Sequence, residues 1–201
     1  ANLGRTTGDI RDSWESVGRI GFMQDRWAGY TGPGHWSDAD MLVVGKVGWG
    51  PNLHSTHLTL NEQYSHISLW CLLSAPLLLG CDLAQLDDFT LSLLTNDEVL
   101  AIDQDTLGKQ ATQISNDGTR VVYAKTLEDC SFAIGFFNRG ETETPVGVKW
   151  GPWGTLATPD GGAKFAIRDL WQQKDLGGFK GKFETKVAPH GVVLVKMTAA
   201  H

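Results

Sequence analysis

The stretch TLNEQYSHISLWCLLSAPLLLG, residues 59–80, is the part of the chain that decides the fold. Thr59 and Glu62 have the spacing of a capping box, and the apolar residues after them recur at helical intervals. Pro76 disfavours helical backbone at the residue before it, so the helix is expected to end there. Residues 77–79 form a short, wholly apolar run, typical of a strand covered on both faces of a parallel sheet. A helix followed by such a strand predicts an α/β fold.

The N-terminal side of this stretch shows the same alternation. Helical spacing of apolar residues predicts a helix over residues 10–22, with Asp12 or Ser13 as its N-cap. A short buried strand near Trp36, or a loop around Asp40, is expected next.

The C-terminal side continues the alternation. Residues 88–94 are expected to be helical, and Thr95-Asn96-Asp97-Glu98 has capping-box spacing, which predicts a further helix through Ile102. Helices alternating with short strands are typical of a parallel barrel or a doubly wound sheet. Because a complete eight-stranded barrel needs about 200 residues or more, we expect residues 1–108 to be the last part of a barrel or a smaller α/β domain.

After Gly108 the pattern changes to short β-rich runs separated by turn residues. The runs are residues 121–124, 132–136, 146–150, 165–167 and 192–195, and the turn signals are residues 116–118, 138–140, 160–162 and 177–178. Short strands at this close spacing predict an antiparallel β-sandwich. We therefore expect an α/β domain over residues 1–108 and a β-sandwich domain over residues 109–201.

Charge and composition exclude several classes of partner. The formal net charge is −6 and Lys and Arg do not cluster, so the basic patch that nucleic acid requires is missing. The longest apolar stretch contains Ser74 and Pro76 and is too short to span a membrane. His54 and His57 have H-x-x-H spacing, but no acidic third ligand is expected near them, so loop packing is favoured over a metal site. We expect no metal, cofactor, nucleic acid or membrane as partner.

Ordered motifs run along the chain: Arg5-x-x-x-Asp9-x-x-x-x-Trp14, GPGHWSDADML at residues 32–42, SAPLLLGCD at residues 74–82 and AIDQDTLGKQ at residues 101–110. In this order they resemble motifs of glycoside hydrolase family 27, the family of α-galactosidases and α-N-acetylgalactosaminidases. The later motifs RDLW and PHGVVL, at residues 168–171 and 189–194, resemble strands of that family's C-terminal sandwich. The resemblance spans nearly the whole chain.

The resemblance implies a retaining glycoside hydrolase with a (β/α)8 barrel followed by an antiparallel β-sandwich. On this basis Asp9 is expected to be the general acid/base, and Arg5 to contact sugar hydroxyls and the catalytic carboxylates. Asp40 is expected to accept hydrogen bonds from sugar hydroxyls, with Met41 beside it at the pocket. The family's nucleophile has no counterpart in the sequence and is expected upstream of Ala1, so this chain on its own is expected to be inactive.

The residue types suit these roles. A retaining glycosidase needs a carboxyl group that is protonated as the leaving oxygen departs and ionised as water attacks, with a partner carboxylate roughly 5 Å away. Arg5 offers a planar fork of donors, and a carboxylate such as Asp40 could hold two neighbouring hydroxyls at once. The alternatives are simpler: Asp9 as a helix N-cap, and Trp49 as a packed loop residue instead of a platform for the sugar. Asp38 is expected to be a structural turn residue and not a catalytic one.

The sequence thus predicts cofactor-free hydrolysis of terminal α-linked galactose from oligosaccharides, polysaccharides or glycoconjugates. Within the family, α-N-acetylgalactosaminidase and β-L-arabinopyranosidase activities are the alternatives, and a noncatalytic carbohydrate-binding module is the alternative of another class. The resemblance also implies a secreted or periplasmic protein. The sequence gives no indication of the oligomeric state.

Overall fold

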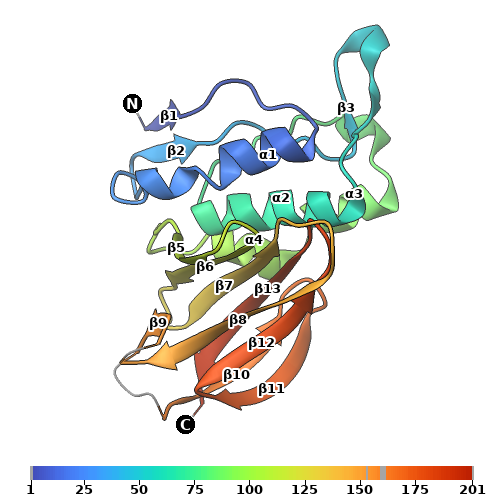
Figure 1. Ribbon diagram of the computed structural model, residues 1–201. Helices are drawn as coiled ribbons and strands as arrows, with labels where there is room; N and C mark the ends of the chain where they lie inside the picture. The colour runs from blue at the N-terminus through green and yellow to red at the C-terminus, as the bar shows by residue number, and fades with distance from the viewer. Residues whose placement is uncertain (1, 153, 159–161, 201) are drawn as a thin grey trace.

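A computed structural model of the chain describes residues 2–152, 154–158 and 162–200. Within these ranges the N-terminal half is α/β and the C-terminal half is an antiparallel β-structure, with helix α2 (Leu60–Leu73) between them (Figure 1). The other helices are α1 (Trp14–Gly21), α3 (Asp88–Leu94) and α4 (Asp97–Asp103), and the strands of this half are β1 (Leu3–Arg5), β2 (Trp36–Asp38), β3 (Lys46–Val47) and β4 (His54–Ser55). None of the helices described is long and apolar enough to cross a membrane.

Strands β1 and β2 pair in parallel, with Leu3 opposite Trp36, and α1 is the crossover between them. Farther along the chain, Leu42 forms a parallel bridge with Leu79. Parallel strands connected by helices are the arrangement expected of part of a (β/α)8 barrel. The predicted fold class, part of a barrel followed by a β-sandwich, is confirmed.

The ends of α1 and α2 follow the predicted capping residues. Ser13 is the N-cap of α1, which leaves the carboxylate of Asp12 available for other contacts. Thr59 opens α2 in the predicted capping box. The helix ends at Ser74, whose φ of 50° lies in the left-handed region, two residues before Pro76.

Two local predictions in this half are wrong. Residues 77–79 form a single bridge instead of a buried strand, and Leu78 and Leu79 are 47% and 44% exposed, because no element among the described residues covers them. Thr95 is not the N-cap of α4: Asn96 takes that position by accepting from Val99 N, while the Thr95 hydroxyl donates back into α3.

The C-terminal half is a sandwich of two sheets. The larger sheet, six-stranded among the described residues, has the order β11-β10-β13-β7-β6-β5, and the smaller has the order β12-β8-β9. The strands are β5 (Thr112–Asn116), β6 (Arg120–Thr126), β7 (Phe132–Asn138), β8 (Thr144–Gly151), β9 (Leu156–Ala157), β10 (Lys164–Asp169), β11 (Lys174–Lys180), β12 (Lys182–Val187) and β13 (Val192–Ala199). The predicted boundary at residues 108 and 109 lies just before β5 and stays a prediction.

The central strands of the larger sheet are buried on both faces. In β6, Val121 and Tyr123 face the core around α2, whereas Val122 and Ala124 face the core between the two sheets. Successive residues of these strands point to opposite faces, and both faces are apolar. This explains why the sequences of the central strands are continuous apolar runs.

The predicted strands correspond to β6, β7, β8, β10 and β13, but β5, β9, β11 and β12 were not predicted. The turn predicted at residues 177–178 is wrong, because both glycines lie within β11, and the chain turns instead at Gly181, whose φ is 75°. Strand β11 is mostly exposed and β12 alternates, so neither has the apolar run by which the others were recognised. The turn predicted at residues 160–162 lies largely outside the described residues.

Helices α2 and α4 join the two halves through a shared core. That core contains Leu72 of α2 together with Tyr123 and Phe137 of the larger sheet. At its edge, Arg168 of β10 donates to both carboxylate oxygens of Glu98 on α4, at 2.6 and 2.7 Å. The α/β half is thus fastened to the sandwich by both apolar and ionic contacts.

Gly135 of β7 lies in this interface where there is no room for a side chain. A Cβ placed there would lie 2.6 Å from Leu72 Cδ1 and 2.6 Å from a ring carbon of Phe137. We expect Gly135→Ala to cost about 1–3 kcal/mol of stability, because both neighbours are packed and must shift. Gly29→Ala is the control, since an added Cβ meets nothing within 4 Å there. Thermal unfolding of the full-length protein checks this, and equal melting temperatures for the two variants would contradict it.

His66 on α2 holds the segment that follows β2. The side chain is fully buried, and its Nε2 accepts a hydrogen bond from the backbone N–H of Val43 at 3.1 Å. Its Nδ1 has no hydrogen-bond partner within the described part of the chain. Burial lowers the pKa of His66 to about 3, so the ring stays neutral in the folded protein.

Acidification should therefore destabilise the fold through His66. An unfolded imidazole titrates near pH 6.5, so this contribution is fully present above pH 6.5 and is lost as the pH falls toward 3. Between pH 7.5 and pH 5 the loss is about 2 kcal/mol. Burial raises the pKa of Asp103 to about 6, which acts in the opposite direction. The measurement is therefore the difference between wild type and His66→Gln in urea unfolding at the two pH values, and a difference that does not change with pH refutes the expectation.

Candidate active site

Arg5, the last residue of β1, connects two carboxylates. Its Nη2 lies 2.5 Å from Oδ2 of Asp40 and 3.0 Å from Oδ1 of Asp9. The parallel pairing of β1 with β2 places Arg5 opposite Asp38, two residues before Asp40. Strand pairing thus brings together residues that are 35 positions apart in the sequence.

Asp40 is the most constrained member of this group. Its φ is 78°, in the left-handed region that Asp tolerates better than most residues but still at a cost. Only 6% of its side chain is exposed. Its Oδ2 accepts from Arg5 and from the N–H of Ile10 at 2.7 Å, and its Oδ1 accepts from the N–H of Met41 at 2.8 Å. The buried charge is therefore paired and hydrogen-bonded, as burial requires.

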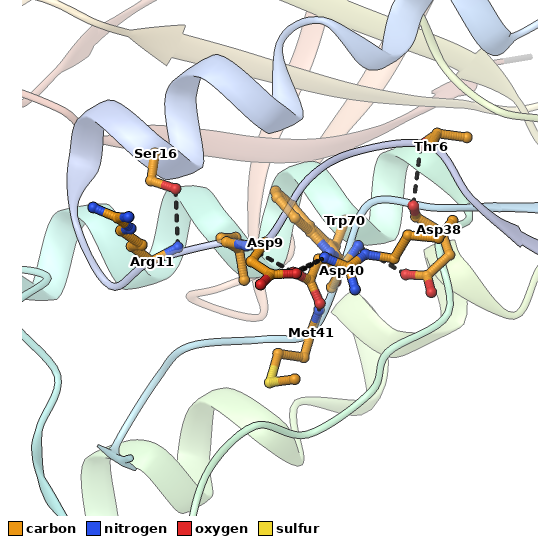
Figure 2. Close-up of polar contacts among 10 residues, drawn as sticks. Thr6, Asp9, Arg11, Ser16, Asp38, Asp40, Met41 and Trp70 are labelled. Carbon is orange, nitrogen blue, oxygen red and sulfur yellow. Dashed lines mark hydrogen bonds and ion pairs between the residues drawn. The ribbon is translucent and has the colours of Figure 1, made fainter. Parts of the chain in front are cut away.

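Further hydrogen bonds fix the backbone around Asp40, as Figure 2 shows. Asp38 accepts from the N–H of Asp40 at 2.8 Å, and the indole of Trp70 donates to the Asp40 carbonyl at 2.7 Å. Thr6 donates to the Asp38 carbonyl at 3.0 Å. Asp38 is buried and has the structural role expected of it. Trp70 and His66 were not predicted as part of the site, although their spacing of four residues on α2 places them on one face of the helix.

All four predicted site residues, Arg5, Asp9, Asp40 and Met41, line one cavity of about 450 Å³. The Asp9 side chain is 96% exposed, so its carboxylate is open to a ligand. Met41 packs against Gly80, where a Cβ would lie 2.6 Å from the Met41 sulfur. Position 80 therefore leaves no room for a side chain beside Met41.

The two aspartates differ in what they can still accept. A carboxylate offers about four acceptor sites. Asp40 accepts hydrogen bonds from three protein donors, so too few acceptor sites remain for two neighbouring sugar hydroxyls. Contact with both hydroxyls would displace a protein donor. Asp9 accepts from Arg5, and its other oxygen has no protein donor within the described residues. Asp9 thus retains more free acceptor positions than Asp40.

The loop between β2 and α2 contributes to the same cavity. Trp49 lines it and is 81% exposed, so it is not the packed loop residue that was the alternative. The expectation that no acidic residue lies near His54 and His57 is wrong: the carboxylate of Asp12 is 2.8 Å from His57 Nδ1. The sequence does not reveal this contact, because Asp12 precedes His57 by 45 positions and only folding brings the two residues together.

Comparison with known proteins identifies the family of this chain. Residues 1–105 match the family described as Alpha galactosidase A, and residues 117–197 match the Alpha galactosidase C-terminal beta sandwich domain. Alpha-galactosidase 2 of Arabidopsis thaliana is 38% identical over 98% of this chain and 46% of its own length. An alpha-N-acetylgalactosaminidase of Gallus gallus is 33% identical over 96% of this chain and 46% of its own length.

Solved structures give the same result. A family 27 β-L-arabinopyranosidase from Geobacillus stearothermophilus, crystallised with arabinose, superposes with a TM-score of 0.89 at 34% identity, covering 100% of this chain and 46% of that one. The chain spans about half the length of the curated relatives it matches. Because the first family match covers more than half of the 201 residues, the chain belongs to glycoside hydrolase family 27, the α-galactosidase family.

Proposed function

We propose that the full protein is a retaining glycosidase that releases terminal α-linked galactose from oligosaccharides, polysaccharides or glycoconjugates without a cofactor. Asp9 is its general acid/base, Arg5 holds the Asp9 carboxylate and contacts the sugar, and Asp40 and Met41 line the sugar pocket. Relatives that are 35–38% identical over nearly the whole chain and are named α-galactosidases support the reaction. The residues are supported by the geometry of the cavity.

One observation carries this proposal. Arg5 links an exposed carboxylate to a buried one inside a single cavity. A guanidinium held by Asp40 is a fixed donor that orients the carboxylate of Asp9, the group that exchanges protons in both steps of a retaining mechanism. The protein thereby places one reactive carboxylate against a rigid support, which an acid/base needs for directional proton transfer.

The nucleophile of the proposed mechanism is not Asp40. A nucleophilic carboxylate needs an oxygen free to attack the anomeric carbon, whereas both Asp40 oxygens accept hydrogen bonds and its side chain is 6% exposed. A retaining mechanism needs its second carboxylate roughly 5 Å from the acid/base. We expect that residue to come from outside the 201 residues, as the family resemblance implies.

Trp49 and Met41 give the cavity its apolar surfaces. The exposed indole of Trp49 is suited to stack on the apolar face of a galactose ring or of the next sugar. Met41 lines the same cavity with a polarizable thioether that can adapt to the shape of a ligand.

The sugar at the cleaved position has two rivals to galactose within the family. One relative is named an α-N-acetylgalactosaminidase and one solved relative a β-L-arabinopyranosidase. Rates on the three corresponding p-nitrophenyl glycosides decide between them. Noncatalytic carbohydrate binding is the alternative of another class, and secretion or a periplasmic location stays a prediction from the resemblance.

Removal of the acid/base should affect substrates according to their leaving group. We expect Asp9→Asn in the full-length protein to lower kcat/KM on melibiose by about 100- to 10,000-fold, the usual contribution of general acid catalysis. The loss in kcat/KM should be smaller on p-nitrophenyl α-galactoside, because nitrophenolate departs with little proton assistance. Azide should restore turnover of the nitrophenyl substrate, since it attacks the glycosyl-enzyme without a base.

The control is Glu15→Gln, which removes an exposed carboxylate from the first turn of α1, outside the residues that line the cavity. It should retain wild-type rates on both substrates. Wild-type kcat/KM on melibiose in Asp9→Asn would exclude Asp9 as the acid/base. No turnover of any of the three glycosides by the wild type, together with retained sugar binding, would favour the noncatalytic alternative.

A further inference from the structure

Three potential metal-ligating side chains meet at the rim of the cavity. Asp12 lies in the segment between Asp9 and α1, His54 is in β4, and His57 follows β4. One ligand atom from each can be chosen so that all three lie within 4.8 Å of one another. Asp12 and His54 also line the cavity that contains Asp9.

The distances around the Asp12 carboxylate are close to those of a tetrahedral site. Its Oδ2 is 2.8 Å from His57 Nδ1 and 3.9 Å from His54 Nδ1. Zinc bonds of 2.0–2.2 Å to nitrogen and oxygen place neighbouring tetrahedral ligands ~3.3 Å apart, between the two observed values. Small side-chain rotations therefore suffice to receive an ion.

The backbone already holds these ligands in place. The N–H of His57 donates to the same Asp12 oxygen at 2.9 Å, and Thr56 is anchored through its N–H to Gly45 O and through its hydroxyl to Val43 O. The rings of His54 and His57 stack with centroids 4.8 Å apart. His54 Nδ1 also lies 2.9 Å from the Ser55 carbonyl oxygen, a contact that the ring gives up when this nitrogen binds an ion.

The types of ligand atom indicate which ion the three side chains would bind. Two imidazoles and one carboxylate suit zinc and neighbouring first-row divalent ions, whereas calcium and magnesium prefer oxygen ligands alone. His57 is 73% exposed and His54 is 43% exposed, so an ion can reach them and a fourth position stays open to water. Because His57 is largely exposed, its side-chain contact with Asp12 by itself adds little stability.

We propose that Asp12, His54 and His57 form a divalent metal site of the zinc type at the rim of the cavity. The bound ion fastens the β3–β4 hairpin, which projects from the rest of the chain in Figure 1, to the segment that carries Asp9. It thereby restricts the loop bearing Trp49 relative to the proposed acid/base. The site is independent of the proposed reaction, because its ligands take no part in it.

Calorimetric titration of the chelator-treated full-length protein with zinc chloride at pH 7.5 tests the site. We expect saturable binding with a stoichiometry near one, and a loss of affinity of at least about tenfold in Asp12→Asn and in His57→Ala. His35→Ala, which removes an exposed histidine from outside the cluster, should bind as the wild type does. Zinc should also slow hydrogen exchange at the amide of His57 in the wild type and in His35→Ala alone.

Melting temperatures without zinc show whether each variant is folded, and Asp12→Asn is the variant of choice because its amide oxygen can still accept from His57 N. Absence of saturable zinc binding by the wild type would overturn the proposal. Equal zinc affinity in wild type, Asp12→Asn and His57→Ala would overturn it as well, since the ion would then lie elsewhere.

Discussion

The buried carboxylate of Asp40 is the constraint on which the site depends. A charge with 6% of its side chain exposed is stable only with partners, and Asp40 takes them from three places: Arg5 at the end of β1, Ile10 after Asp9, and Met41 next to it. Each partner belongs to a segment that lines the cavity. Satisfying one buried charge thus sets the position of the proposed acid/base segment and of the pocket residue Met41.

Helix α2 packs against the segment that contains Asp40 and connects it to the sandwich. Its Trp70 donates to the carbonyl of Asp40 and its His66 accepts from Val43, so the strained backbone at Asp40 is held on one side by the helix. The other face of α2 packs on the larger sheet, where Leu72 meets Gly135. The sandwich therefore contributes to the site indirectly, by fixing the helix on which Asp40 rests.

The sequence predicted helices and strands correctly where one physical effect, such as helix capping or burial, produces the residue pattern. The capping box at Thr59 predicted α2, and the apolar runs of the central strands predicted the β-sandwich. Exposed strands such as β11 were missed, because their residues carry no apolar run and the glycines at 177 and 178 resemble a turn. Residues 77–79 were predicted as buried, since an apolar run does not reveal whether a covering element is present.

For the candidate site, too, the sequence identified residues but not the contacts between them. Motifs identified Arg5, Asp9, Asp40 and Met41, and the structure places all of them on one cavity. The left-handed backbone of Asp40, its contact with Arg5 and the approach of Asp12 to the two histidines all depend on strand pairing and loop packing between distant segments. Such contacts leave no local signal in one sequence, so only the folded chain reveals them.

Residue-resolved hydrogen exchange in Asp40→Asn tests the central claim most directly. An amide has one acceptor oxygen where the carboxylate has two, so it cannot satisfy the N–H groups of Ile10 and Met41 together with Arg5. We predict exchange about 10- to 100-fold faster at the amide of Ile10 or Met41 in the full-length variant, the equivalent of one lost hydrogen bond to a charged group. The amides of α2 should remain protected. Unchanged exchange at both Ile10 and Met41 would show that Asp40 does not organise the site.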